Sequence, residues 1–151
     1  MCLYIGSREA TQDIDAATND GDANIEAVET LRTYADKMSV LFNLPSGWLH
    51  SGGNMYITEP MKKTAVRAFE MSNLVVNFLN WKSMLVLKII AFREQPDITD
   101  SVAILRKYNI RSADDIYKWI QELKPEWIYI HGRPCCLIRQ TGVLNHMKRM
   151  F

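Results

Sequence analysis

Long stretches of the chain carry apolar residues at every third or fourth position, with polar residues between them. This spacing places the apolar side chains on one face of an α-helix. It predicts helices over residues 23–39, 81–93, 97–108 and 112–123, and terminal helices over 1–5 and within 137–151. Two residues mark helix starts: Pro96 suits a first helical turn, and the Ser112 hydroxyl is a good cap for backbone N–H groups.

Shorter apolar runs, bounded by turn residues, predict strands over 13–17, 66–71 and 74–79. Ser72 and Asn73 predict a tight turn, which makes the last two strands a hairpin. We expect the three strands to form one small mixed or antiparallel sheet flanked by helices, with a helical second half, hence an α+β fold. Residues 44–53 are typical of a loop. Its Trp48 either anchors the loop to the core or stacks on a base, and anchoring is the commoner role.

Composition narrows the class of protein. With 151 residues, of which 48% are hydrophobic, the chain suits one compact core. We expect a single domain with a sheet-bearing part over 1–95 and a helical part over 96–151. The 18 basic and 17 acidic residues nearly cancel. This balance excludes a strongly basic surface for nucleic acid, so that any contact with RNA is local.

The sequence contains no signal for export or for a membrane. The apolar run 84–92 is interrupted by Lys88 and is far shorter than the about 20 residues that a spanning helix needs. No signal peptide is visible. Cys2, Cys135 and Cys136 lack the spacing of a zinc site, and we expect reduced thiols. We therefore expect a cytoplasmic protein that does not bind a membrane.

Two carboxylates stand two residues apart in the first predicted strand. Side chains alternate along a strand, so Asp13 and Asp15 point the same way while Ile14 turns into the core. Hard divalent cations such as Mg²⁺ take oxygen ligands and are held by one or two carboxylates together with substrate phosphates. The pair therefore predicts a site for Mg²⁺ or Mn²⁺ in nucleotide chemistry, although such pairs are also common in surface turns.

The context of this pair is residues 6–15, which read Gly-Ser-Arg-Glu-Ala-Thr-Gln-Asp-Ile-Asp. The run resembles the Gly-x-Arg-x-x-Thr-x-Asp-Ile-Asp signature of the minimal nucleotidyltransferases that share the DNA-polymerase-β catalytic fold. Within that superfamily the chain is most similar to AbiEii-like, toxin-related members and their neighbours of unknown function. The resemblance spans residues 1 to about 120, including the Leu-Pro-x-x-Trp-Leu segment at 44–49. It implies that Asp13 and Asp15 hold the metal and that Ser7 and Arg8 contact the nucleotide.

A second group of residues centres on Lys88, which interrupts an otherwise apolar helix. Burying an ammonium group without a partner is costly, so Lys88 needs a carboxylate, a phosphate or a route to water. Asp97 and Asp100 lie three residues apart, on one face of the next helix. The order of the lysine and the acids resembles the AbiEii-like pattern, which implies that Lys88 approaches the nucleotide phosphates. In that pattern one of the later acids supports the active site or the lysine, and Asp97 and Asp100 are the candidates among the nucleotide-binding residues. Alternatively, Lys88 reaches water along its own stem and the acids are ordinary helix-start residues.

The chain departs from the family pattern at two points. The family places a glycine-rich turn before its first helix, and this chain begins after that point. Either the start codon has been placed late, the chain is truncated, or the phosphate cradle has been lost. The strand 74–79 also offers Asn77 where a two-metal centre usually has a third acid, and Glu70 is the nearest substitute. The three histidines lack the spacing of a metal site; they are His50, His131 and His146.

The function implied is a Mg²⁺-dependent nucleotidyltransferase that moves a nucleoside monophosphate from a triphosphate to RNA, such as a tRNA end, or to a protein. Lys88 steadies the phosphates and Asp15 deprotonates the acceptor hydroxyl. The toxin-like resemblance adds a cognate antitoxin as an expected partner. Two alternatives stay open: a degenerate nucleotidyltransferase fold that binds nucleotides or proteins without transfer, and a structural domain whose acids are solvated.

Overall fold

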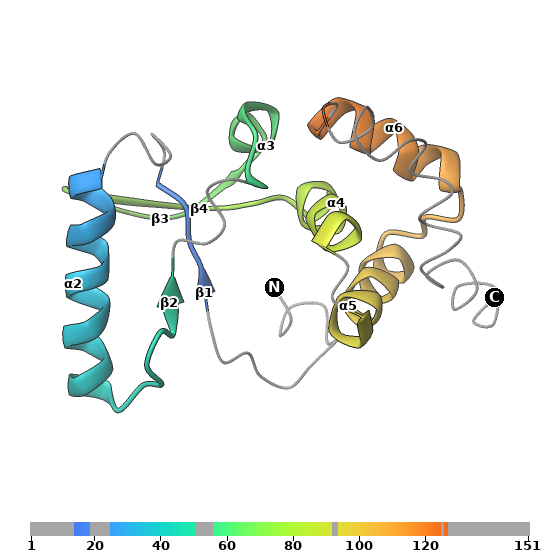
Figure 1. Cartoon of the computed structure of the whole chain (residues 1–151). Helices are drawn as coiled ribbons and strands as arrows, with labels where there is room; N and C mark the ends of the chain where they lie inside the picture. Colours follow the sequence, from blue (N-terminus) through green and yellow to red (C-terminus); the bar gives the residue numbers. More distant parts are fainter. Residues whose placement is uncertain (1–13, 19–24, 51–55, 92–93, 125, 127–151) are drawn as a thin grey trace. The chain divides into compact units, whose positions relative to one another are not determined.

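The computed structural model describes residues 14–18, 25–50, 56–91, 94–124 and 126 (Figure 1). They divide into two compact units, an N-terminal unit up to Thr58 and a C-terminal unit from Glu59 onward. Five helices and two pairs of strands lie in these residues, which confirms the predicted α+β class. The single domain expected from chain length stays a prediction. The terminal helices predicted over 1–5 and 137–151, and the three cysteines, lie outside the described residues.

The N-terminal unit packs one helix against a small parallel ladder. Strand β1 (Ile14–Asp15) runs parallel to β2 (Leu49–His50). Helix α2 (Ile25–Phe42) lies between them in the chain and extends past the predicted end at residue 39. Within this unit its main packing is with β2. Strand β2 falls inside the segment expected to be a loop, because a strand of two residues is too short to show an alternating pattern.

A loop folds back from the end of α2 and is tied to that helix. The backbone of Asn43 is left-handed, with φ 51°, which ends the helix. The Ser39 hydroxyl then donates to the Leu44 carbonyl at 2.9 Å. The half-buried Trp48 indole N–H donates to the Ala35 carbonyl at 3.0 Å. These bonds confirm that Trp48 anchors the loop.

Two expectations for the first strand are wrong. Ile14 was expected to turn into the core, yet it is 51% exposed. The strand was also expected to join the hairpin, but within the described residues β1 pairs with β2 alone. The physical reason is the same in both cases: alternation of side chains says which residues share a face, but not which other element covers that face.

The described residues of the C-terminal unit form a hairpin and four helices. Its elements are α3 (Glu59–Lys63), β3 (Val66–Met71), β4 (Leu74–Phe78), α4 (Trp81–Ala91), α5 (Glu94–Lys107) and α6 (Ala113–Leu123). The hairpin, the buried helix after it and the two following helices confirm the predictions, and Pro96 lies in the first turn of α5. The short helix α3 was not predicted.

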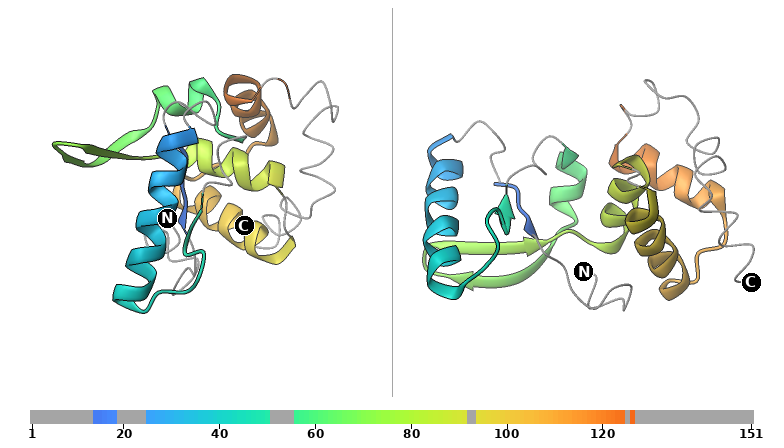
Figure 2. Two further views of the ribbon diagram at one scale, coloured as in Figure 1. Left: turned by 60° about the vertical axis from the view of Figure 1, so that its left-hand side comes forward. Right: turned by 60° about the horizontal axis from the view of Figure 1, so that its bottom comes forward.

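The core of this unit lies between α4 and the two helices that pack against it, α5 and α6 (Figure 2). Its fully buried apolar side chains include Leu85, Ile104, Ile116 and Ile120, and Met61 of α3 is fully buried as well. None of the helices in the described residues combines the length and the apolar character that crossing a bilayer requires.

Polar caps and aromatic contacts fix the helix ends of this unit. The Ser112 hydroxyl accepts hydrogen bonds from two backbone N–H groups at the start of α6, at 3.2 and 3.4 Å, which confirms it as the N-cap. At the start of α4, the Trp81 ring stacks on Tyr108 with centroids 4.2 Å apart and meets the edge of Trp119 at 5.2 Å. The three aromatic rings therefore join α4, the end of α5 and α6.

Candidate functional site

A buried cluster of one lysine and two aspartates lies between α4 and α5. The Lys88 Nζ is 2.6 Å from Asp100 Oδ2 and 3.4 Å from Asp97 Oδ1. The two aspartate side chains are 0% and 1% exposed, and that of Lys88 is 11% exposed. The structure thus brings together three of the residues singled out from the sequence. The sequence analysis expected Lys88 to need a carboxylate, a phosphate or a route to water, and in the structure its ammonium group contacts two carboxylates.

The position of the acids follows from the helical period of α5. Its buried stripe contains Asp97, Asp100, Ser101, Ile104 and Leu105, which are spaced as one helix face. The last two residues of the stripe are apolar and the first three are polar. Extending the apolar stripe backwards along the helix therefore finds both acids, and it also finds Ser101, which sequence reasoning had missed.

Two buried hydroxyl groups lie on the same pair of helices. Ser83 on α4 is 0% exposed and Ser101 on α5 is 1% exposed. Their hydroxyl oxygens have no hydrogen-bond partner among the described residues. Removing charged and polar groups from water is costly even when they are paired. An interface between α4 and α5 made of apolar residues would avoid this cost, so the polar groups are not explained by packing alone.

The acidic motif of the first strand is described only in part. Asp15 lies on β1 opposite His50, and its side chain is exposed to solvent. Asp13, Ser7 and Arg8 lie outside the described residues. Among the residues that the structure does describe, no three histidine, cysteine, aspartate or glutamate side chains form a group that could hold a metal ion. The metal-binding role of the motif stays a prediction.

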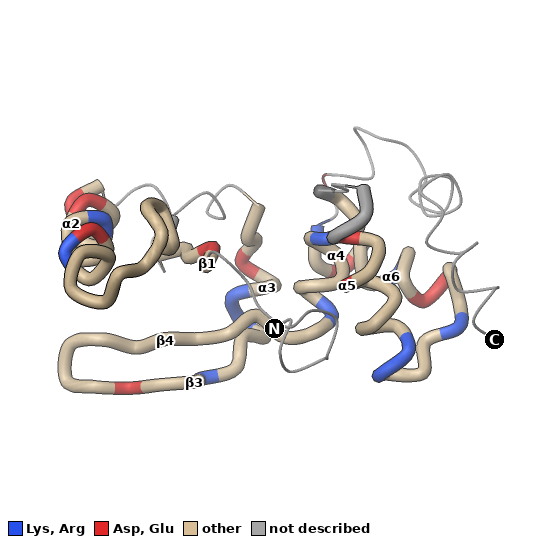
Figure 3. Tube along the Cα trace, turned by 90° about the horizontal axis from the view of Figure 1, so that it is seen from below, with Lys and Arg blue, Asp and Glu red and all other residues tan. Residues whose placement is uncertain are grey.

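The substitute for a third acid has a partner of its own. Glu70 lies on β3, where Figure 3 marks acidic and basic positions along the tube. Its carboxylate is 2.7 Å from the Arg67 guanidinium, and both side chains are exposed. Asn77 faces Arg67 across the hairpin. Among the histidines, His50 ends β2, whereas His131 and His146 lie outside the described residues.

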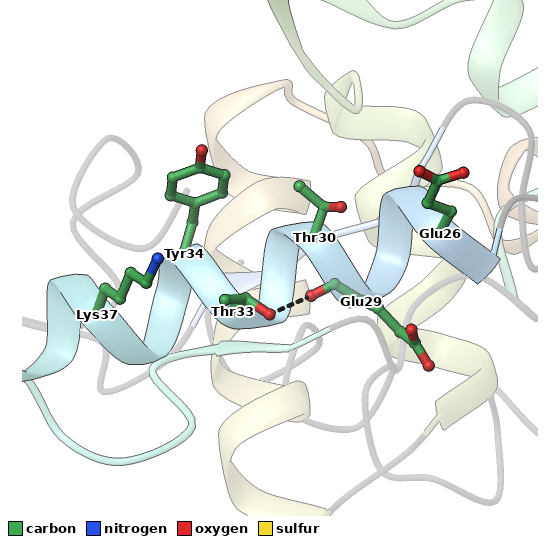
Figure 4. A pocket seen from close by; sticks show the side chains of 6 residues that line it. All are labelled: Glu26, Glu29, Thr30, Thr33, Tyr34 and Lys37. Atoms are coloured by element: carbon green, nitrogen blue, oxygen red, sulfur yellow. Dashed lines mark hydrogen bonds between the residues drawn. The ribbon is translucent and has the colours of Figure 1, made fainter.

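A shallow hollow of about 300 Å³ runs along the exposed side of α2 (Figure 4). It is lined by Glu26, Glu29, Thr30, Thr33, Tyr34 and Lys37. All six side chains come from one helix. The Thr33 hydroxyl donates a hydrogen bond to the Glu29 backbone carbonyl at 2.9 Å. A binding pocket usually encloses its ligand with several elements. The hollow therefore has the character of an ordinary helix surface, and it contains none of the predicted site residues.

Comparison of the chain with protein-family models, with curated proteins and with solved structures found no match.

Proposed function

We propose that this chain is a Mg²⁺-dependent nucleotidyltransferase that transfers a nucleoside monophosphate from a triphosphate to a hydroxyl group of RNA or protein. Two features support the proposal. One is the resemblance of residues 6–15 to the nucleotidyltransferase signature. The other, which carries most weight, is the buried contact of Lys88 with Asp97 and Asp100.

The contact supports a function because the fold does not require it. Replacing a buried ion cluster by apolar residues of similar size is often neutral or stabilising by about 1–4 kcal/mol. A lysine and two acids at the α4–α5 interface therefore stabilise the fold no better than leucines would. Buried charged groups that an apolar core would not need are concentrated at functional sites, where they bind ligands or take part in catalysis.

The geometry of the cluster suits a lysine that is held in place by the acids. Asp100 makes the closer contact, and Asp97 the longer one, so the ammonium has a restricted position. The 11% exposure of Lys88 leaves part of the side chain open to solvent. In the proposed reaction Lys88 steadies the triphosphate, Asp97 and Asp100 position Lys88, and Ser7 and Arg8 contact the nucleotide.

The donor set of the acidic motif fits Mg²⁺ or Mn²⁺. Asp15 is exposed on its strand, and Asp13, which stands two residues before it in the sequence, lies outside the described residues. Carboxylate oxygens are the ligands that hard divalent cations take in proteins. Such an ion, when bound by Asp13 and Asp15, neutralises the charge that develops on the phosphates.

The transfer forms one bond and breaks another. The acceptor hydroxyl oxygen attacks the α-phosphorus of the triphosphate and forms a new P–O bond. The bond from the α-phosphorus to the oxygen that bridges it to the β-phosphorus breaks, and its electron pair leaves with pyrophosphate. The Asp15 carboxylate accepts the proton of the attacking hydroxyl.

A second candidate function is nucleotide binding without transfer. The observation that favours it is that Lys88 already has two carboxylate partners, and that its side chain is mostly buried. A lysine held in this way is a weaker phosphate ligand than a free one. Binding of a triphosphate with no product of transfer would distinguish this function from the first.

The test uses the full chain with each of the four nucleoside triphosphates, labelled at the α-phosphate, in the presence of Mg²⁺ or Mn²⁺. Total tRNA and the protein itself serve as acceptors. We expect label on one acceptor, and loss of that label in Asp13→Asn and Asp15→Asn. Asp36→Asn is the matched control, because Asp36 is an exposed acid on α2 of the same unit.

Each result bears on a different part of the proposal. Triphosphate binding that needs the divalent ion and Asp15, without label transfer, would select the binding module. Absence of both binding and transfer for all four triphosphates would overturn the proposal. Equal loss of transfer in Asp36→Asn would also contradict it, since the effect would then not belong to the acidic motif.

A further inference from the structure

The β3–β4 hairpin has one wholly apolar face. In its register, residues that face each other across the two strands share a side of the ribbon. Three such pairs form the apolar face: Val66 with Phe78, Phe69 with Val76, and Met71 with Leu74. The opposite face carries Arg67 opposite Asn77 and Glu70 opposite Val75.

A β-bulge creates this division. Strict alternation along β3 would place Val66 and Phe69 on opposite faces, because they are three residues apart. The ladder is irregular between Arg67 and Phe69, so that Ala68 is the extra residue. The extra residue shifts the phase of the strand, and Phe69 and Met71 join Val66 on one face.

The apolar face lies open. Five of its six side chains are exposed, by 67% for Phe78, 61% for Val66, 59% for Met71, 50% for Leu74 and 48% for Phe69. The sixth, Val76, is half-buried. Within the C-terminal unit, the described helices pack mainly with one another, whereas β3 packs mainly with β4. A two-stranded hairpin is only marginally stable in water unless a helix or another sheet covers it. The face therefore requires a partner.

We propose that this apolar face binds the same face of a second copy of the chain, in a two-fold symmetric dimer of stacked hairpins. The face is suited to a copy of itself because it carries no charge. The charged residues of the hairpin are Arg67 and Glu70, coloured blue and red on β3 in Figure 3. They lie on the other side of the ribbon and pair with each other. Two identical faces thus meet without charge repulsion. In a two-fold dimer every contact occurs twice, because both copies use the same residues.

The size of the face agrees with a dimer. Five of the six side chains are about half or more exposed and Val76 is half-buried. Two of the five are phenylalanines, which bury about 150–250 Å² each when fully covered, so the face presents on the order of 500 Å². This is near the upper limit of the apolar patches found on monomers, which extend to about 600 Å². Two copies stacked about 10 Å apart bury about 1,000 Å² in total, which is the lower limit for a specific interface. We therefore expect an association that depends on protein concentration.

Neighbouring valines of β4 provide a matched test. Val76 lies on the apolar face and Val75, next to it in the same strand, lies on the polar face. Sedimentation velocity of the full chain over a wide concentration range should show a dimer for the wild type and for Val75→Lys, but a monomer for Val76→Lys. A wild type that stays monomeric, or a Val76→Lys variant that dimerises like the wild type, would overturn the proposal.

A second measurement does not depend on how Val76→Lys folds. A photo-crosslinking benzoylphenylalanine at position 69, on the apolar face, should join two chains in a covalent dimer. The same group at position 75, on the polar face, should not. Cross-linking from position 69 only within one chain would contradict the dimer and assign the cover of this face to the chain itself.

Discussion

Replacing Lys88 by methionine tests whether the lysine neutralises two buried acids. Methionine keeps an apolar stem of similar length and removes the ammonium that lies 2.6 Å from Asp100 and 3.4 Å from Asp97. Removing one partner of a buried ion pair costs about 3–5 kcal/mol, because the remaining charge is left uncompensated. Both aspartates have further interactions in the structure. Because these interactions still compensate part of the charge, we expect the free energy of unfolding to fall by about 3 kcal/mol, the lower end of that range.

The assay is denaturant unfolding followed by far-UV circular dichroism at neutral pH. Lys118→Met is the matched control, since Lys118 is 68% exposed and lies 4.0 Å from Asp115, which is 50% exposed. An exposed ion pair of this kind contributes at most about 1 kcal/mol. The two lysine variants should therefore differ by about 2 kcal/mol or more.

The difference between the two lysine variants tests the cause of the loss. If Lys88→Met destabilises the protein no more than Lys118→Met at neutral pH, the idea that Lys88 neutralises buried acids is refuted.

Three further predictions concern single contacts. Ser112→Ala removes the acceptor for two backbone N–H groups of α6 and should cost about 1 kcal/mol in denaturant unfolding; no change would mean that the cap is dispensable. Trp48→Phe removes the hydrogen bond to the Ala35 carbonyl and should cost about 0.5–1.5 kcal/mol, with a larger loss pointing to packing instead. The hydrogen bond from Lys62, followed by its charge, lowers the pKa of Glu59 from its ordinary value of 4.5. The stabilisation from this pair is therefore present above pH 4.5 and is lost as the pH falls through the lowered pKa. NMR titration should find the pKa of Glu59 closer to 4.5 in Lys62→Met, and an unchanged value would contradict the assignment.

Local sequence signals predicted most of the C-terminal unit. The hairpin turn at Ser72 and Asn73, the cap at Ser112 and the helical spacing of apolar residues each act over a few residues, so they can be recognised without knowledge of the rest of the fold. The sequence analysis grouped Lys88 with Asp97 and Asp100 through the AbiEii-like resemblance, and their contact in the structure follows from local packing. Two consecutive helices pack against each other, and their facing positions follow from the helical period.

Contacts that depend on distant parts of the chain were harder to predict. The pairing of β1 with β2 joins Ile14 to Leu49 across the length of α2, and neither two-residue strand carries a pattern that specifies its partner. The bulge at Ala68 was also missed, because the strand was predicted from its apolar run and the turn after it, without assigning its side chains to faces. The spacing of Val66, Phe69 and Met71, three residues and then two, is the signal that would have found it.

The central proposal is that nucleotide binding needs both the acidic motif and Lys88. It is tested by calorimetric titration of the Mg²⁺ complexes of ATP, GTP, CTP and UTP into the wild type, Asp15→Asn, Lys88→Met and the double variant, each first checked for folding by circular dichroism. The claim predicts that at least one triphosphate binds the wild type and that each single substitution weakens this binding about tenfold or more. It also predicts that the double variant loses less than the two single losses combined, by about 0.5–3 kcal/mol, as residues that share a ligand do. A wild type that binds none of the four, or losses that add fully in the double variant, would contradict it.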